Sequence, residues 1–180
     1  MNKTPEQLLK KLALLSTLAA SSAMADPQSS GNATDNSFSV DDNFRHGWHE
    51  VTAGSSVYFT SYVRRADHPE MNYAGGFLQA AYNLTSPGSD SIFRGGFQLA
   101  PEIFGADVYH GYGSYVAGGT LWLRYNFVQP GWRLVPFIEG GAGLTSIDIP
   151  HRYDGKDFNF NLEVGGGVRY FICERCSLNA

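Results

Sequence analysis

The most specific chemical motif in the sequence is a pair of cysteines, Cys173 and Cys176, separated by Glu174 and Arg175. Two thiols at this spacing can form a thioredoxin-type redox pair, half of a zinc site, or a disulfide across a short turn. A redox pair needs a helix N-terminus, and none is evident here. A zinc site needs two more ligands, and no second C-x-x-C exists. We therefore favour a disulfide across a hairpin turn, or two thiols that have no chemical role.

The histidines do not form a recognisable catalytic motif. None of the five is followed two positions later by serine, and there is no G-x-S-x-G nucleophile elbow. His46 and His49 could share a metal ion, but a third ligand is missing. His110 and His151 fall in loops or at strand ends, where exposed polar residues are ordinary. We therefore assign no catalytic residue, no cofactor and no metal ligand.

The charged residues that alternate with apolar ones are the remaining candidates. If they face the inside of a narrow barrel they must pair, because an unpaired buried charge costs several kcal/mol. Glu139 is the most conspicuous carboxylate, and we interpret it as an ion-pair partner; Glu50 could also take part. The interior ion-pair candidates are Arg94, Arg124, Arg169, Glu102, Glu139 and Glu163.

The elements that would position these residues are β-strands. Segments of about a dozen residues alternate with the period of a strand, and turn residues rich in Gly, Pro and Asp separate them. This spacing predicts a meander of antiparallel hairpins. The predicted strands are 48–62, 72–84, 91–104, 115–127, 134–147 and 158–172.

A strand with one apolar face has two interpretations. In a soluble barrel or sandwich the apolar face is the core. In an outer-membrane barrel it meets lipid, and the polar face points inward. The polar faces here are short and rich in glycine, with few lysines, and aromatic residues cluster near strand ends as in a membrane girdle. We therefore predict an all-β, antiparallel, up-and-down transmembrane β-barrel.

Length and composition exclude several classes of protein. With 180 residues, one domain is expected. The hydrophobic fraction of 43% is too high for a disordered chain. A net charge of −4 argues against a nucleic-acid partner. No apolar run beyond the first 25 residues is long enough for a transmembrane helix.

The N-terminus reads as a targeting segment. Lys3, Lys10 and Lys11 precede a short apolar run that ends in Ala23-Met24-Ala25, an A-x-A cleavage signature. We predict a signal peptide over 1–25, a flexible polar leader over 26–46, and an incomplete barrel over 47–180. Export of this kind predicts the bacterial outer membrane as the location.

The predicted barrel has about six and a half strands, since 177–180 reads as the start of a seventh. Single-chain bacterial barrels have an even number of strands, at least eight. An open edge in a bilayer leaves backbone groups unpaired, which is prohibitive. We therefore expect the sequence to be a C-terminally truncated part of a longer chain.

Two neighbouring strands carry a family resemblance. The stretch Leu134-Val-Pro-Phe-Ile-Glu-Gly-Gly-Ala-Gly-Leu144, followed by the glycine-rich strand 158–171, resembles the PagL-type lipid A 3-O-deacylases, also called acyloxyacyl hydrolases. The resemblance covers residues 48–180. It implies an eight-stranded outer-membrane barrel that removes the 3-position acyl chain of lipid A, the lipid anchor of lipopolysaccharide, with a Ser-His-Glu triad.

The chain departs from the family where the chemistry lies. The family's His-x-Ser belongs to the seventh strand and its Glu further on, so both would fall beyond residue 180. The 180-residue chain is therefore predicted to be inactive. The alternatives are a non-enzymatic outer-membrane barrel with a structural or adhesive role, and a soluble periplasmic barrel for a hydrophobic ligand. The sequence leaves the oligomeric state open.

Overall fold

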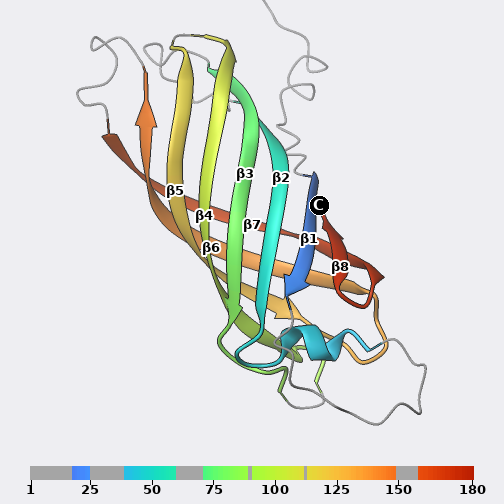
Figure 1. The fold of residues 1–180 in the computed structure, drawn as a ribbon. Coiled ribbons are helices and arrows are strands. Elements are labelled where there is room, and N and C mark those ends of the chain that lie inside the picture. The colour runs from blue at the N-terminus through green and yellow to red at the C-terminus, as the bar shows by residue number, and fades with distance from the viewer. Residues whose placement is uncertain (1–17, 25–38, 60–70, 89–90, 112, 149–157) are drawn as a thin grey trace, which may run out of the picture.

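The fold is a sheet of antiparallel strands that curls around a central axis (Figure 1). The computed structural model describes residues 18–24, 39–59, 71–88, 91–111, 113–148 and 158–180. Within these ranges the only helical element is a single 3-10 turn, η1, at Asp41–Phe44. The prediction of an all-β antiparallel fold is confirmed.

Six long strands follow the segments predicted from the sequence. They are β2 (His49–Phe59), β3 (Asn72–Asn83), β4 (Gly95–His110), β5 (Tyr115–Phe127), β6 (Leu134–Ile147) and β7 (Phe158–Cys173). The start of β4 lies later than predicted. The reason is a local turn, in which the amides of Phe93 and Arg94 donate to the hydroxyl and carbonyl oxygens of Ser91.

Two short strands complete the order. β8 (Cys176–Asn179) pairs with the last residues of β7, and β1 (Leu18–Met24) pairs with both β2 and β8. The strand order from β1 to β8 therefore closes on itself. The segment Leu18–Met24 lies inside the predicted signal peptide, and the alternation analysis did not anticipate a strand there. Its removal stays a prediction, and residues 1–17 lie outside the described part of the chain.

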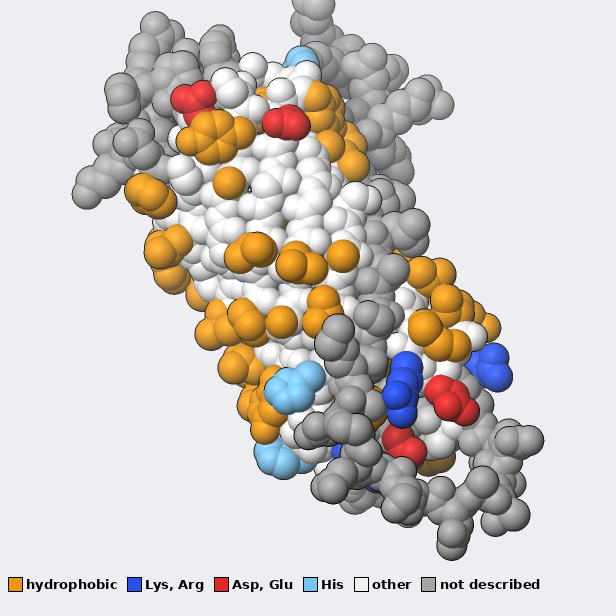
Figure 2. Space-filling model, viewed as in Figure 1, with side chains coloured by type: hydrophobic (Ala, Val, Ile, Leu, Met, Phe, Trp, Pro, Cys, Tyr) orange, Lys and Arg blue, Asp and Glu red, His pale blue; other side chains and the backbone are white. Residues whose placement is uncertain are grey.

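Alternation along the strands separates a polar interior from an apolar exterior. In β7, Leu162 and Val164 are 76% and 89% exposed, whereas Arg169 is 1% exposed. Figure 2 shows the outcome on one face, where charged side chains of the described residues lie near the two ends. The described part of the chain contains no helix with the length and apolar character that a membrane crossing needs.

Glycines on the interior face make room for large side chains. A Cβ atom on Gly141 would lie 2.8 Å from both the indole ring of Trp122 and the methyl group of Thr120. Trp122 itself is 8% exposed, so its ring occupies the interior space that Gly141 leaves open. The glycine-rich polar faces are thus required by packing inside a narrow barrel.

One end of the barrel is closed by residues 40–44, which we call the plug. Val40 and Phe44 form an apolar cluster with Val128, Val135 and Phe171. Asn43 joins the plug to strand ends on both sides, because its side-chain amide donates to the carbonyl of Glu174 and its own carbonyl accepts from Asn83. We expected a flexible leader to continue to residue 46; the packed structure instead begins at Val40. Residues 26–38 lie outside the described ranges.

The plug predicts a specific loss of stability. Phe44 is 1% exposed and packs edge-on against Phe171 with 5.9 Å between ring centroids. Phe44→Ala should lower the free energy of unfolding by about 3–5 kcal/mol, as for other buried Phe residues. Phe158→Ala is the control, because Phe158 is 70% exposed on the barrel exterior and should cost less than half as much. Urea denaturation followed by tryptophan fluorescence measures both; equal losses would contradict a packed plug.

Candidate functional site

The interior of the barrel holds the charged residues that the sequence singled out. A cavity of about 270 Å³ lies there, lined among others by Gln79, Glu102, Arg124, Glu139 and Glu163. These side chains come from β3, β4, β5, β6 and β7, so the closure of the sheet brings together residues far apart in sequence.

Arg124 is the centre of this cluster. Its guanidinium forms an ion pair with Glu139 at 2.7 Å, with the two side chains 5% and 15% exposed. The strand register explains the pairing, because Arg124 and Glu139 are directly opposite each other on β5 and β6. The guanidinium also donates to Gln79 at 3.1 Å and lies 4.6 Å from the centroid of the Phe137 ring.

Glu102 and Glu163 are held by neutral donors. The amide of Gln79 donates to Glu102 at 3.0 Å. The hydroxyl of Thr120 donates to Glu163 at 3.1 Å, and the amide of Asn161 also donates to this carboxylate. Among the described residues no ion pair is recorded for either glutamate. The structure therefore places both candidates in the interior, but with hydrogen-bond partners in place of the arginines.

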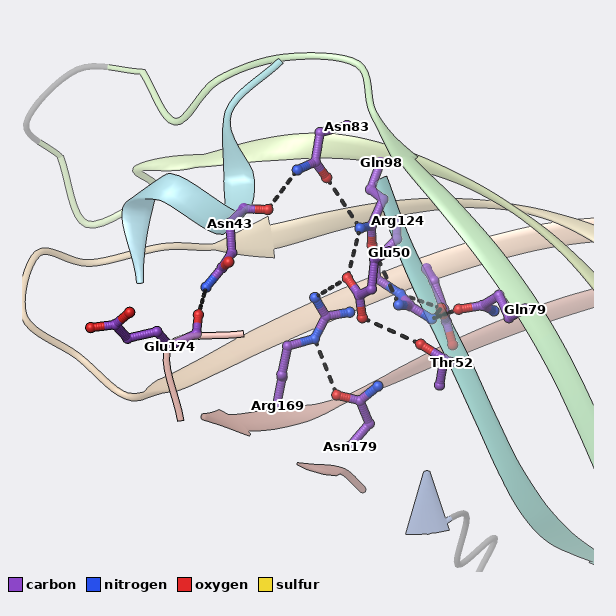
Figure 3. Close-up of polar contacts among 11 residues, drawn as sticks. Asn43, Glu50, Thr52, Gln79, Asn83, Gln98, Arg124, Arg169, Glu174 and Asn179 are labelled. Atoms are coloured by element: carbon purple, nitrogen blue, oxygen red, sulfur yellow. Dashed lines mark hydrogen bonds and ion pairs between the residues drawn. The ribbon is translucent and has the colours of Figure 1, made fainter. Parts of the chain in front are cut away.

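Arg169 anchors a second network nearer the plug (Figure 3). It forms an ion pair with Glu50 at 2.7 Å, and both side chains are almost fully buried. The Glu50 carboxylate also accepts from Gln98 at 3.1 Å and from Thr52 at 3.3 Å. The Nε of Arg169 donates to the side-chain oxygen of Asn179 at 3.1 Å. β2, β4 and β7 thus meet at the Glu50 carboxylate, and β8 joins them through Arg169.

The ion-pair partner of Arg94 lies outside the strands. The Arg94 guanidinium pairs with Asp41 of the plug at 2.9 Å and donates to the carbonyl of Val128 at 2.8 Å. Sequence reasoning missed Asp41 because the residue lies in the segment assigned to the leader. The one available signal was the acidic pair Asp41 and Asp42 directly before the apolar Phe44.

The cysteines form a disulfide across the turn between β7 and β8. Cys173 and Cys176 are bonded, with their Cα atoms 5.0 Å apart. They are register partners in the β7–β8 pair, so the two-residue turn Glu174-Arg175 sets them opposite each other. The arrangement is the hairpin disulfide that the sequence favoured over a redox pair or half of a zinc site.

Two of the described histidines, His46 and His49, contact neighbouring groups. A ring nitrogen of His46 lies 2.8 Å from the carbonyl oxygen of Leu84, and the ring of His49 lies 5.0 Å from that of Tyr82. His110 is the last residue of β4. Within the described ranges no group of three or more His, Cys, Asp and Glu side chains could hold a metal ion. His68 and His151 lie outside these ranges.

The interior contacts fix the charged side chains in place. Arg94, Arg124 and Arg169 are each bound by a carboxylate from another part of the chain, and Glu102 and Glu163 accept hydrogen bonds from amides and a hydroxyl. Such a network stabilises one register of the strands. Comparison with known proteins adds no assignment, because no family model, no curated protein and no solved structure matches the chain.

The Arg124–Glu139 pair yields a prediction about stability. Glu139→Gln leaves a buried guanidinium without its carboxylate, which should cost about 3–5 kcal/mol of unfolding free energy. The control is Asp42→Asn, since Asp42 pairs with Arg45 through side chains 58% and 68% exposed. That variant should cost about 1 kcal/mol or less.

The double variant Arg124→Gln/Glu139→Gln separates the pair from its surroundings. It should be less destabilised than the sum of its single variants, because neither charge is left uncompensated. Equilibrium urea unfolding measures all four proteins. Additive losses would show that the two residues act independently.

Proposed function

We propose that this chain forms a transmembrane β-barrel in the bacterial outer membrane, reached by means of a cleaved signal peptide. We further propose that it is the barrel part of a PagL-type lipid A 3-O-deacylase, whose catalytic segment lies beyond residue 180. The proposed enzymatic activity requires the proposed membrane barrel, whereas the barrel does not require the activity.

The observation that carries the proposal is the inverted polarity of the sheet. Large apolar side chains cover the exterior of four neighbouring strands, while charged and amide side chains fill the interior. In water, such an exterior would be an apolar patch far larger than soluble monomers tolerate. In a bilayer the same surface is satisfied by lipid. The exposed residues include Phe97, Ile103, Leu121, Leu123, Ile138, Leu144, Phe160, Leu162 and Val164.

The length of the strands supports the same conclusion. β4 and β7 have 16 residues and β6 has 14. A tilted transmembrane strand needs about 9–11 residues, so each of these strands can cross a bilayer and extend beyond it. Tyr125 and Phe97, whose ring centroids are 4.8 Å apart, lie toward the plug end of β5 and β4, where a girdle residue would meet the interface.

The deacylase assignment rests on the resemblance of the adjacent strands β6 and β7 and on the space beside them. β8 has four residues, so along β7 it reaches only the plug end. Along the rest of β7, from Phe158 to Val164, the described residues provide a strand partner only on the β6 side. A longer strand continuing from β8 would occupy that position, and it is where the family's His-x-Ser belongs. Lipid A in the surrounding leaflet is the proposed substrate.

A second candidate is a non-enzymatic outer-membrane barrel with a structural or adhesive role. The described interior favours it, because its charged side chains bind one another across the strands and stabilise the barrel. The two candidates share the barrel and differ in the strand beside β7.

Membrane insertion predicts a depth-dependent cost for a charge on the exterior. Leu162→Arg should destabilise the protein in lipid vesicles by about 2–4 kcal/mol, since Leu162 lies on the exposed face of β7, more than one full side-chain repeat inside the strand end. Phe158→Arg, on the same face but at the strand end, should cost about 1 kcal/mol or less. Unfolding by urea in vesicles of defined composition measures both. Similar small effects at the two positions would argue against a bilayer environment.

The enzymatic half of the proposal has its own test. The 180-residue chain should release no 3-position fatty acid from purified lipid A, as measured by mass spectrometry. The same gene read past the codon for Ala180 should encode His-x-Ser in the next strand, and the longer product should be active until that serine is changed to alanine. An extended barrel without the motif would leave the non-enzymatic candidate, and activity of the short chain would overturn the assignment of the catalytic segment.

A further inference from the structure

A second cavity lies on the outside of the barrel at the plug end. Its volume is about 710 Å³, within the range of small-molecule sites. Its walls come from the turn before β4, from the end of β5 and from the turn that leads into β6. Ile92, Phe127, Pro130, Trp132 and Pro136 supply the apolar walls, and Gln129 is among the polar ones.

The cavity faces the exterior because its two strand residues point outward. Phe127 stands between Asn126 and Val128, which are both 0% exposed, so its side chain is on the opposite face. Pro136 stands in the same way between the buried Val135 and Phe137. The walls are therefore continuous with the apolar exterior of β5 and β6.

Hydrogen bonds hold the two turns in place around the cavity. The side-chain amide of Gln129 donates to the carbonyls of Ser91 and Ile92, each at 3.1 Å. The hydroxyl of Tyr125 donates to the carbonyl of Phe93 at 2.6 Å. The cavity is thus formed in advance and does not require a rearrangement to receive a ligand.

The rim of the cavity exposes large apolar side chains that nothing in the described chain covers. Ile92 is 80% exposed and Trp132 is 55% exposed, and Phe93, beside Ile92, is 67% exposed. Contiguous exposure of this kind marks an interaction surface. The polar groups are already engaged, because Arg94 is bound to Asp41 and to the carbonyl of Val128. The cavity therefore offers apolar contact and no free charge for a headgroup.

We propose that this cavity holds one acyl chain of a phospholipid from the periplasmic leaflet, an inference that rests on the proposed outer-membrane location. We assign the plug end to the periplasm because its connections are the shorter set: 84–94, 128–133 and 174–175 have 11, 6 and 2 residues, against 12, 4 and 10 for 60–71, 111–114 and 148–157 at the other end. Short turns lie on the periplasmic side of bacterial barrels. The continuity of the walls with the lipid-facing exterior selects a lipid chain as the occupant. The bound chain would fix the depth of the barrel in the leaflet.

Native mass spectrometry tests the proposal with the full 180-residue chain, folded in detergent and titrated with dioleoyl phosphatidylethanolamine. The wild-type protein should retain one phospholipid. Ile92→Ser removes an exposed wall residue and should weaken retention about tenfold. Ile172→Ser is the matched control, since Ile172 is 55% exposed on the exterior of β7 and does not line the cavity; it should leave retention unchanged.

Three results would overturn the proposal. The first is a folded barrel that retains no phospholipid, and the second is retention that Ile92→Ser and Ile172→Ser reduce equally. The third is that the chain extracted from outer membranes carries a bound protein and no bound lipid, and that Ile92→Ser no longer binds this protein. Heat-modifiable migration on a gel, measured in parallel, distinguishes these results from failure of the barrel itself: a chain that does not insert into vesicles contradicts the proposed location as well.

Discussion

A buried guanidinium needs a carboxylate, and in this barrel that requirement connects nearly every strand. Arg169 and Glu50 bring β7 to β2, Arg124 and Glu139 bring β5 to β6, and Gln98 joins the two networks by donating to Glu50 and accepting from Arg124. An uncompensated charge in this space costs several kcal/mol, so a register in which any one pair is broken is strongly disfavoured. The polar interior therefore specifies how the strands align, a task that an apolar core performs in soluble sheets.

At the end of the barrel, the plug meets the same need for a carboxylate beside a guanidinium. Asp41 supplies the carboxylate that Arg94 lacks among the strands, and Phe44 covers the network below Arg169, with the guanidinium 5.6 Å from the ring centroid. A water-filled opening at this end would screen both charges and weaken the pairs that align the strands. The plug and the ion pairs thus stabilise one another, and the apolar exterior is left free to contact its surroundings.

Alternation in the sequence was sufficient to predict the six long strands and the inward direction of Arg124, Arg169 and Glu139, because the side-chain period of a strand is local information. The partners were harder to predict, since they depend on register and on closure between residues far apart in the chain. Glu102 and Glu163 were expected in ion pairs and instead accept hydrogen bonds from Gln79 and Thr120. The plug was missed because its few apolar residues lie within a polar stretch and acquire their role only from the barrel end that they fill.

The strand position between β2 and β7 matters both for the closure of the barrel and for the proposed function. In the structure Leu18–Met24 fills part of it as β1, with backbone pairs to β2 and to β8. The proposed signal peptidase cleavage would remove that strand, and the edges of β2 and β8 would then lose their partner. An unpaired edge in a bilayer costs several kcal/mol for each unsatisfied group, so cleavage and membrane insertion together require another strand. In the proposed deacylase the catalytic segment would be that strand, and closure of the barrel and assembly of its active site would then be a single event.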